Sequence, residues 1–162
     1  MVDAVWARPE PVARLAAHDA AAWEALFEAY YERLRRFAYV RTGDLHAAED
    51  IAAEVFSAAV KGIGRYRFTG APLGAWLYRI ARNVTADHLD RRRRRPVLSL
   101  DGLDVEAMGL LALVDDRNDL ARAIAALTRE QQEFIALRFF NDCSLDEVAQ
   151  AMGRSRGAVK ML

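Results

Sequence analysis

Cations alternate with aromatic side chains in the segment from Arg65 to Phe68, which reads Arg-Tyr-Arg-Phe. Aromatic rings stack on unpaired bases and guanidinium groups bind phosphates, so this spacing is typical of a contact with single-stranded nucleic acid. The alternative is that Tyr66 and Phe68 anchor the segment in a local core. The residue pattern alone leaves both interpretations open.

Residue sets for catalysis, metal binding or disulfide formation do not occur in the sequence. There is no Ser/His/Asp or Cys/His nucleophile set and no glycine-rich phosphate-binding loop. His18, His46 and His88 are far apart, and the single cysteine, Cys143, excludes an internal disulfide. We therefore expect no enzyme activity, no metal site and no cofactor.

The formal net charge is zero, but positive and negative residues are separated along the chain. Between residues 61 and 96 the only acidic residues are Asp87 and Asp90, and the basic residues include the run Arg91–Arg95. Such a segment suits a phosphate partner, although an arginine run at a helix end is also typical of a solvated face. The next segment, residues 97–117, is acidic, and this reversal of charge indicates a linker.

Three helices are predicted in the first half of the chain. Apolar residues spaced three and four apart predict a helix that Asp19 caps and that ends near Gly43. Asp44 would cap a second helix, over about 45–61, and a third runs from Leu73 through the arginine run to Pro96. The apolar stripe of the first helix comprises Trp23, Phe27, Tyr30, Leu34 and Phe37.

The second half is predicted to be helical as well. One helix is expected around residues 118–127, and capping boxes at Thr128 and Ser144 begin two more. Gly153 then makes a turn, and Ser155 caps a further helix. This order of short helices predicts a helix-turn-helix, with a plain helical hairpin as the alternative.

The polar edge of the last helix, Ser155, Arg156 and Lys160, would face a DNA major groove in a helix-turn-helix. About two helical turns separate Ser155 from the last residue, Leu162, which is short for a reading helix. We therefore expect the sequence to stop inside this helix.

The predicted fold is all-α, with two small helical domains joined by a flexible linker. The first domain, residues 1–96, is a bundle of three to four helices, and the second, residues 118–162, is the helix-turn-helix. The linker spans 97–117. No run of about 18 apolar residues and no secretory leader occurs, so we expect a cytoplasmic protein.

Several of these motifs resemble the extracytoplasmic-function (ECF) sigma factors of the sigma-70 superfamily. The segments Tyr30–Phe37, Thr42–Asp44 and Ala48–Phe56 are similar to regions 2.1 and 2.2, although Ala53 stands where the family usually has glutamine. The segment Trp76-Leu-Tyr-Arg-Ile-Ala-Arg-Asn83 is similar to regions 2.3 and 2.4. Most of the chain from Leu127 to Lys160 is similar to region 4, after which the family usually continues with small polar and basic residues, whereas Met161-Leu162 ends this sequence.

The resemblance implies a transcription initiation factor that directs core RNA polymerase to promoters. Its partners would be the polymerase beta-prime clamp and beta flap, promoter DNA and an anti-sigma factor, and the linker would thread toward the RNA exit channel. The implied polymerase-binding residues are Asp50, Ile51, Glu54, Val55 and Phe56. The implied minus-10 residues, which capture melted strand, are Arg65, Tyr66, Arg67, Phe68, Trp76, Arg79, Arg82 and Asn83, and duplex minus-35 recognition falls to Ser155, Arg156 and Lys160.

Two other classes of protein are compatible with the residues. One is a helix-turn-helix regulator that binds duplex operators as a dimer, and the other is a helical protein-interaction module whose arginines only aid solubility. The regulator does not account for the aromatic residues of the basic loop. Tight duplex binding by the chain alone would favour the regulator, and partner binding without any DNA dependence would favour the module.

Overall fold

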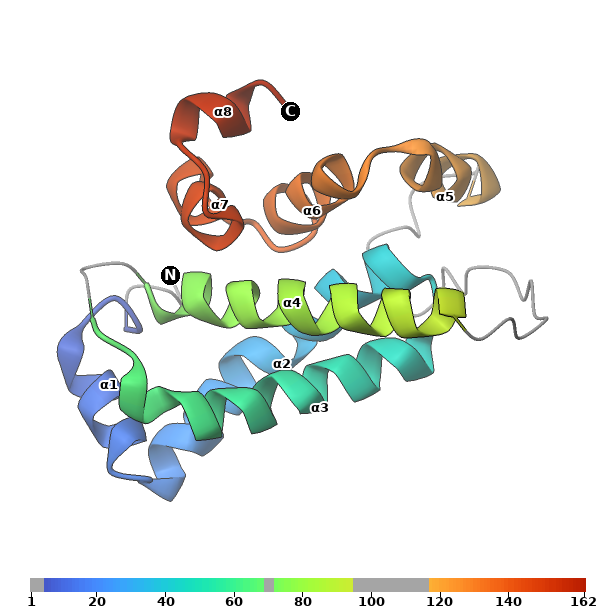
Figure 1. Ribbon diagram of the computed structural model, residues 1–162. Coiled ribbons are helices and arrows are strands. Elements are labelled where there is room, and N and C mark those ends of the chain that lie inside the picture. Colours follow the sequence, from blue (N-terminus) through green and yellow to red (C-terminus); the bar gives the residue numbers. More distant parts are fainter. Residues whose placement is uncertain (1–4, 69–71, 95–116) are drawn as a thin grey trace.

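The computed structural model describes residues 5–68, 72–94 and 117–162, and Figure 1 shows their arrangement. All elements formed by these residues are helices, which confirms the all-α prediction. Residues 97–116 of the predicted linker lie outside the described residues, and residue 117 already begins a helix. The elements are α1 (Pro9–Ala16), α2 (Ala20–Thr42), α3 (Leu45–Gly62), the 3-10 helix η2 (Ile63–Arg65), α4 (Leu73–Arg94), α5 (Arg117–Ala126), α6 (Arg129–Arg138), α7 (Leu145–Met152) and α8 (Arg156–Lys160).

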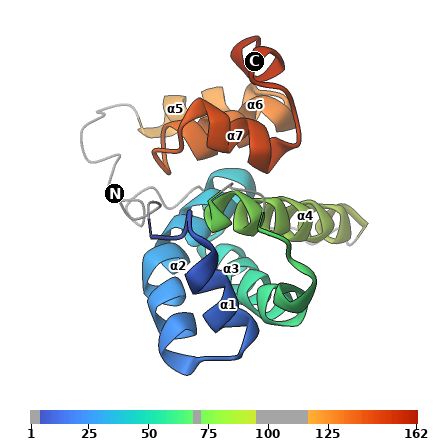
Figure 2. The same cartoon turned by 90° about the vertical axis from the view of Figure 1, so that its left-hand side faces the viewer.

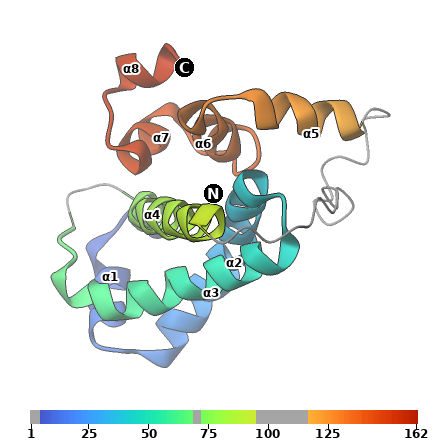
Figure 3. The ribbon, with the colours of Figure 1, turned by 45° about the vertical axis from the view of Figure 1, so that its right-hand side comes forward.

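The helices form two groups, which we call the N-terminal bundle (α1–α4 with η2) and the C-terminal unit (α5–α8). In Figure 1 the three long helices α2, α3 and α4 lie in the lower half, with the short α1 at one end. Figures 2 and 3 show the C-terminal unit lying over α4 from two further directions. The unit therefore covers one side of the bundle.

Local caps begin and end α2 and begin α3 where the sequence predicts them. The Asp19 side chain accepts a hydrogen bond from the Ala22 N–H, and Asp44 likewise begins α3. Gly43, at φ 65°, donates its N–H to the carbonyl of Tyr39. These contacts satisfy backbone groups that a helix end leaves without intrahelical partners. Helices α2 and α3 therefore follow one another in a tight hairpin.

The core of the N-terminal bundle follows the predicted stripe of α2 with one exception. Tyr30, Leu34 and Phe37 are fully buried and Trp23 is half-buried, but Phe27, the fifth residue of the stripe, is 46% exposed. Leu26, on the other flank of the stripe, is buried instead, because the face that meets α3 and α4 is rotated toward it. The Phe27 ring instead stacks on Tyr31, with ring centroids 4.7 Å apart.

A close approach of α4 to α2 sets the position of the helix that carries the predicted minus-10 residues. Gly74 lies in the first turn of α4, and a Cβ added there would come 2.6 Å from the Tyr30 hydroxyl. Only glycine leaves room for this contact. The short helix α1 is not predicted from the sequence, because its buried residues Val12 and Leu15 are too few to give a periodic signal.

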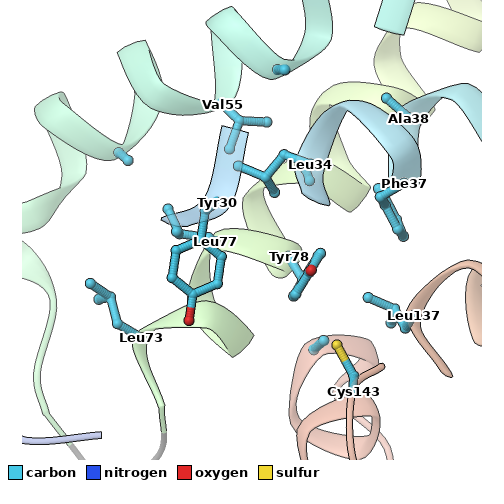
Figure 4. Close-up of a cluster of buried hydrophobic side chains, with 14 of the residues drawn as sticks. Tyr30, Leu34, Phe37, Ala38, Val55, Leu73, Leu77, Tyr78, Leu137 and Cys143 are labelled. Atoms are coloured by element: carbon cyan, nitrogen blue, oxygen red, sulfur yellow. The ribbon is translucent and has the colours of Figure 1, made fainter. Parts of the chain in front are cut away.

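An apolar core runs between the two groups of helices. Leu137 of α6 and Cys143, between α6 and α7, belong to the same buried cluster as Phe37 and Tyr78 of the bundle. Figure 4 shows these side chains facing one another across the boundary between the groups. The C-terminal unit is therefore packed onto the bundle through buried side chains.

Candidate nucleic-acid and polymerase interfaces

Tyr66 of the basic loop lies against the first turns of α4. The ring centroids of Tyr66 and Trp76 are 5.0 Å apart, and the Trp76 ring faces Gly62, where an added Cβ would lie 3.4 Å from it. Burial raises the pKa of the Tyr66 hydroxyl, and the nearby Arg79 guanidinium opposes this rise. Both rings are half-buried, so they are anchored in the core and still present part of their surface to solvent.

Three of the predicted minus-10 residues share one face of α4. Trp76, Arg79 and Asn83 are spaced three and four apart, which places them on the same side of a helix. Arg79 and Asn83 are exposed on this face, and Tyr66 adjoins it through Trp76. The remaining predicted loop residues are the exposed Arg65 and Arg67 and the half-buried Phe68.

Arg79 and Arg82 of α4 donate hydrogen bonds to the last turn of α7. Arg79 Nη2 lies 3.1 Å from the carbonyl oxygen of Gln150, and Arg82 Nη1 lies 3.0 Å from that of Met152. The last carbonyls of a helix lack intrahelical partners and form the negative end of its dipole. In this arrangement, backbone oxygens occupy two arginines that the resemblance assigns to promoter DNA.

A buried carboxylate, Glu133 of α6, joins the C-terminal unit to two helices of the bundle. Its Oε1 accepts a hydrogen bond from Arg41 Nη1 at 2.8 Å, and its Oε2 accepts one from Arg82 Nε at 2.7 Å. The side chain of Arg41 has 0% exposure, and this burial lowers the pKa of its guanidinium while the Glu133 carboxylate opposes the shift.

The pairing of Arg41 with Glu133 could not be predicted from the sequence. They are 92 residues apart, and neither belongs to a motif. A cation in the last turn of a helix, such as Arg41 in α2, is common because it complements the helix dipole. No local signal distinguishes Arg41 from such a residue.

The predicted polymerase-binding residues on α3 divide into an exposed and a buried set. Asp50 and Glu54 are exposed, whereas Ile51 and Val55 are 1% and 0% exposed and belong to the core of the bundle. Phe56 is 9% exposed and packs against Phe27, with ring centroids 5.0 Å apart. Ile51 and Val55 can therefore contribute to a partner contact only by holding α3 in place.

Two arginines at the end of α4 lie near carboxylates of α3 and of its N-cap. Arg91 lies 3.7 Å from the Glu54 carboxylate, and Arg92 lies 3.6 Å from that of Asp44. Ion pairs this exposed contribute about 0–1 kcal/mol. Residues 91–94 of the arginine run are thus a largely solvated face whose charges remain accessible.

The predicted helix-turn-helix is present in α7 and α8. Both capping boxes form, and Gly153 takes the left-handed conformation at φ 65° between the two helices. The Ser155 hydroxyl accepts a hydrogen bond from the Ala158 N–H and so caps α8, while Arg156 lies 3.4 Å from the Asp146 carboxylate. Arg156 and Lys160 are both exposed.

Neither a metal-binding cluster nor a membrane-spanning helix occurs among the described residues. No group of three or more His, Cys, Asp and Glu side chains there is placed to hold a metal ion. Over the same part of the chain, none of the helices combines the length and the apolar character needed to cross a membrane.

Two family models match the chain. A model of sigma-70 region 2 matches residues 26–95, and a model of sigma-70 region 4 matches residues 117–162. The solved structure of CnrH in complex with the cytosolic domain of CnrY is similar to this chain with a TM-score of 0.72. It covers 96% of this chain and 88% of that one at 22% identity, so it supports the fold.

Curated relatives support the same assignment. The chain is 35% identical over 159 residues to the ECF RNA polymerase sigma factor BldN of Streptomyces coelicolor, covering 94% of this chain and 60% of BldN. It is 31% identical over 153 residues to the ECF RNA polymerase sigma factor SigL of Mycobacterium tuberculosis, covering 92% of this chain and 86% of SigL. These matches confirm the resemblance stated from the motifs. The chain therefore belongs to the ECF sigma factors of the sigma-70 family.

Proposed function

We propose that this protein is a transcription initiation factor that binds core RNA polymerase and directs it to specific promoters, and that it is not an enzyme. The observation that carries the proposal is the match of the region 2 and region 4 models, in that order, to residues 26–95 and 117–162. Sigma factors are non-enzymatic initiation factors. We assign region 2 to residues 1–96, a linker to 97–117 and region 4 to 118–162.

The face of α4 that carries Trp76, Arg79 and Asn83, with Tyr66 beside it, is the proposed site for the melted minus-10 strand. Stacking of a base on an aromatic ring contributes about 1–3 kcal/mol. Extruding a base from a duplex costs a few kcal/mol. Stacking and pocket contacts can therefore offset strand separation without ATP, because they are available only to unpaired bases. Arg65, Arg67, Phe68 and Arg82 complete the proposed minus-10 set.

The helix-turn-helix of α7 and α8 is the proposed reader of the minus-35 duplex. Arg156 and Lys160 are exposed cations for phosphates or base edges, and Ser155 both caps α8 and marks where it would enter the major groove. Polymerase holds the two contacts at promoter spacing, so each weak contact acts at a high effective concentration.

The polymerase contact is proposed to lie on α3. The exposed carboxylates Asp50 and Glu54, with Phe56 at the edge of the core, would meet the beta-prime clamp, and region 4 would meet the beta flap. Ile51 and Val55 would support this face from the core. A cytoplasmic location follows from such a role.

Control by an anti-sigma factor is also part of the proposal. CnrH, whose fold this chain shares, has been solved in complex with a second protein, the cytosolic domain of CnrY. The proposed partner of this chain would cover the bundle and the C-terminal unit together, because both carry surfaces that polymerase and DNA require.

Run-off transcription tests the proposed function. Core RNA polymerase would be supplied with a pool of promoter fragments, with and without the chain, and the transcripts mapped. New, discrete start sites that depend on the chain are expected. No stimulation by a chain that binds duplex DNA tightly on its own would point instead to a helix-turn-helix regulator.

A further inference from the structure

We propose that Arg41 and Arg82 form a phosphate-binding site on the N-terminal bundle, which Glu133 fills in this structure and a promoter phosphate fills when the C-terminal unit moves away. The inference rests on the proposed function, because it adds Arg41 to the DNA-binding residues. It also implies that the packing of the C-terminal unit on the bundle hinders DNA binding. DNA and Glu133 would compete for the same two guanidinium groups.

The geometry at Glu133 is that of anion recognition by two arginines. Arg41 reaches the carboxylate from the end of α2, and Arg82 reaches it from the middle of α4, each on a different oxygen at 2.8 and 2.7 Å. Charge-assisted contacts of this length are the strong class of hydrogen bond, and arginine forms them equally with carboxylate and phosphate. The site therefore has the chemistry of a phosphate cradle.

Glu133 does not use all the donors of this site. Arg41 Nε and Nη2 are buried and have no hydrogen-bond partner among the described residues. Two cations share one carboxylate here, and buried donors left without acceptors reduce the stability of such a cluster. A phosphodiester carries the same unit charge and adds ester oxygens as further acceptors, so it can take up donors that Glu133 leaves unused.

Backbone carbonyl oxygens of α7 are further acceptors for arginines of α4 at the boundary between the bundle and the C-terminal unit. Arg79 and Arg82 donate to the carbonyls of Gln150 and Met152 in the last turn of α7. Asn83 follows Arg82 directly, and Trp76 lies two turns earlier on the helix. A strand whose bases reach Trp76 and Asn83 would bring its backbone close to Arg82, which favours a nucleic-acid phosphate over the carboxylate of an acidic peptide.

The test is the binding of a fluorescein-labelled single-stranded 20-nucleotide DNA by the full chain, measured by anisotropy over a range of salt concentrations. The variant is Glu133→Gln, which keeps the shape of the side chain and removes its charge. The matched control is Glu130→Gln, on the same helix, because Glu130 pairs with Arg154 inside the C-terminal unit. Circular dichroism would establish that each variant is folded.

We expect Glu133→Gln to bind the strand at least about tenfold more tightly, because apparent affinity scales with the fraction of molecules in the competent state. Glu130→Gln should change affinity by less than about twofold. Adding Arg41→Gln to Glu133→Gln should remove much of the gain and lower the salt slope by about 0.7, the value for one phosphate of a single strand. Arg82→Gln, at a more exposed position, is the second variant should Arg41→Gln fail to fold.

Three results would each overturn the inference. The first is equal affinity and salt slope for Glu133→Gln and Glu130→Gln. The second is a gain in affinity that neither Arg41→Gln nor Arg82→Gln reduces. The third is competition by a poly-glutamate peptide of equal charge that is as effective as competition by unlabelled DNA. Because this assay contains no polymerase, failure of the proposed function would appear separately, as absent run-off transcripts.

Discussion

Replacing Gly74 by alanine tests whether the approach of α4 to α2 is as close as the structure has it. The added methyl group would lie 2.6 Å from the hydroxyl oxygen of Tyr30 and 2.8 Å from a ring carbon, both within the repulsive range. Tyr30 has 0% exposure, so its ring cannot move aside into solvent. Helix α4 must therefore shift, and with it the face that carries Trp76.

The expected change in the free energy of unfolding follows from two opposing contributions. Overpacking a core by one methyl group costs about 1–3 kcal/mol, and alanine in place of glycine returns up to about 1 kcal/mol of helix propensity. Because Gly74 is in the first turn, where the propensity gain is smaller, we expect Gly74→Ala to lower the free energy of unfolding by about 1–2 kcal/mol. For a chain of this size that corresponds to a fall in Tm of about 2–8 °C.

Urea unfolding followed by circular dichroism would measure the effect as a lower transition midpoint with an unchanged slope. Gly64→Ala is the matched control, since a Cβ there meets nothing within 4 Å, and it should stay within about 0.5 kcal/mol of the natural chain. Combining Gly74→Ala with Tyr30→Phe removes the shortest contact, so the double variant should be more stable than the sum of the single effects. Stability of Gly74→Ala equal to or above that of the natural chain would refute the reasoning.

Three further changes have defined outcomes. Leu137 is 1% exposed, so Leu137→Ala opens a cavity in the core between the bundle and the C-terminal unit. It should lower the free energy of unfolding, measured in urea, by about 2–5 kcal/mol. A loss below about 1 kcal/mol would mean that the two groups are not packed as described. Trp76→Ala should weaken binding of single-stranded DNA by about 5- to 150-fold in an anisotropy titration, since stacking contributes about 1–3 kcal/mol per base. Duplex binding should be unchanged, and equal losses on both kinds of DNA would contradict a stacking role. A hydrogen bond and charge from Arg129 lower the pKa of the Asp90 carboxyl below its ordinary 3.8, so stability from this pair is present above the unfolded-state pKa and is lost as pH falls through the lower folded-state pKa. Carbon-13 NMR titration should find that the pKa of Asp90 rises toward 3.8 in Arg129→Gln, and an unchanged pKa would rule out the pair in solution.

The parts of the fold that depend on short-range signals could be predicted from the sequence. Asp19, Asp44, Thr128, Ser144 and Ser155 each begin a helix where their spacing predicts it, because a cap and the backbone groups it satisfies lie within three residues. Burial on α2 was less predictable. Phe27 belongs to the predicted apolar stripe and Leu26 lies beside it, and only the placement of α3 and α4 decides which of them is covered.

The residues proposed for the site come from composition and resemblance, whereas the contacts between them could not be predicted. The loop aromatics and the α4 face were identified from composition and resemblance, and the structure brings Tyr66 and Trp76 together. The ion pairs of Glu133 with Arg41 and Arg82 connect residues 92 and 51 positions apart, and such pairs leave no periodic trace in a single sequence. The burial of Ile51 and Val55 likewise depends on which side of α3 faces α2 and α4.

Permanganate footprinting on a promoter found by run-off transcription detects strand opening directly, because permanganate oxidises unpaired thymines. With core polymerase and the natural chain, reactive thymines are expected at the minus-10 element, and they should be absent when the chain is omitted and strongly reduced with Trp76→Ala. The same thymine reactivity with Trp76→Ala as with the natural chain, or reactivity without the chain, would contradict the account that this chain opens promoters by capturing unpaired bases on α4.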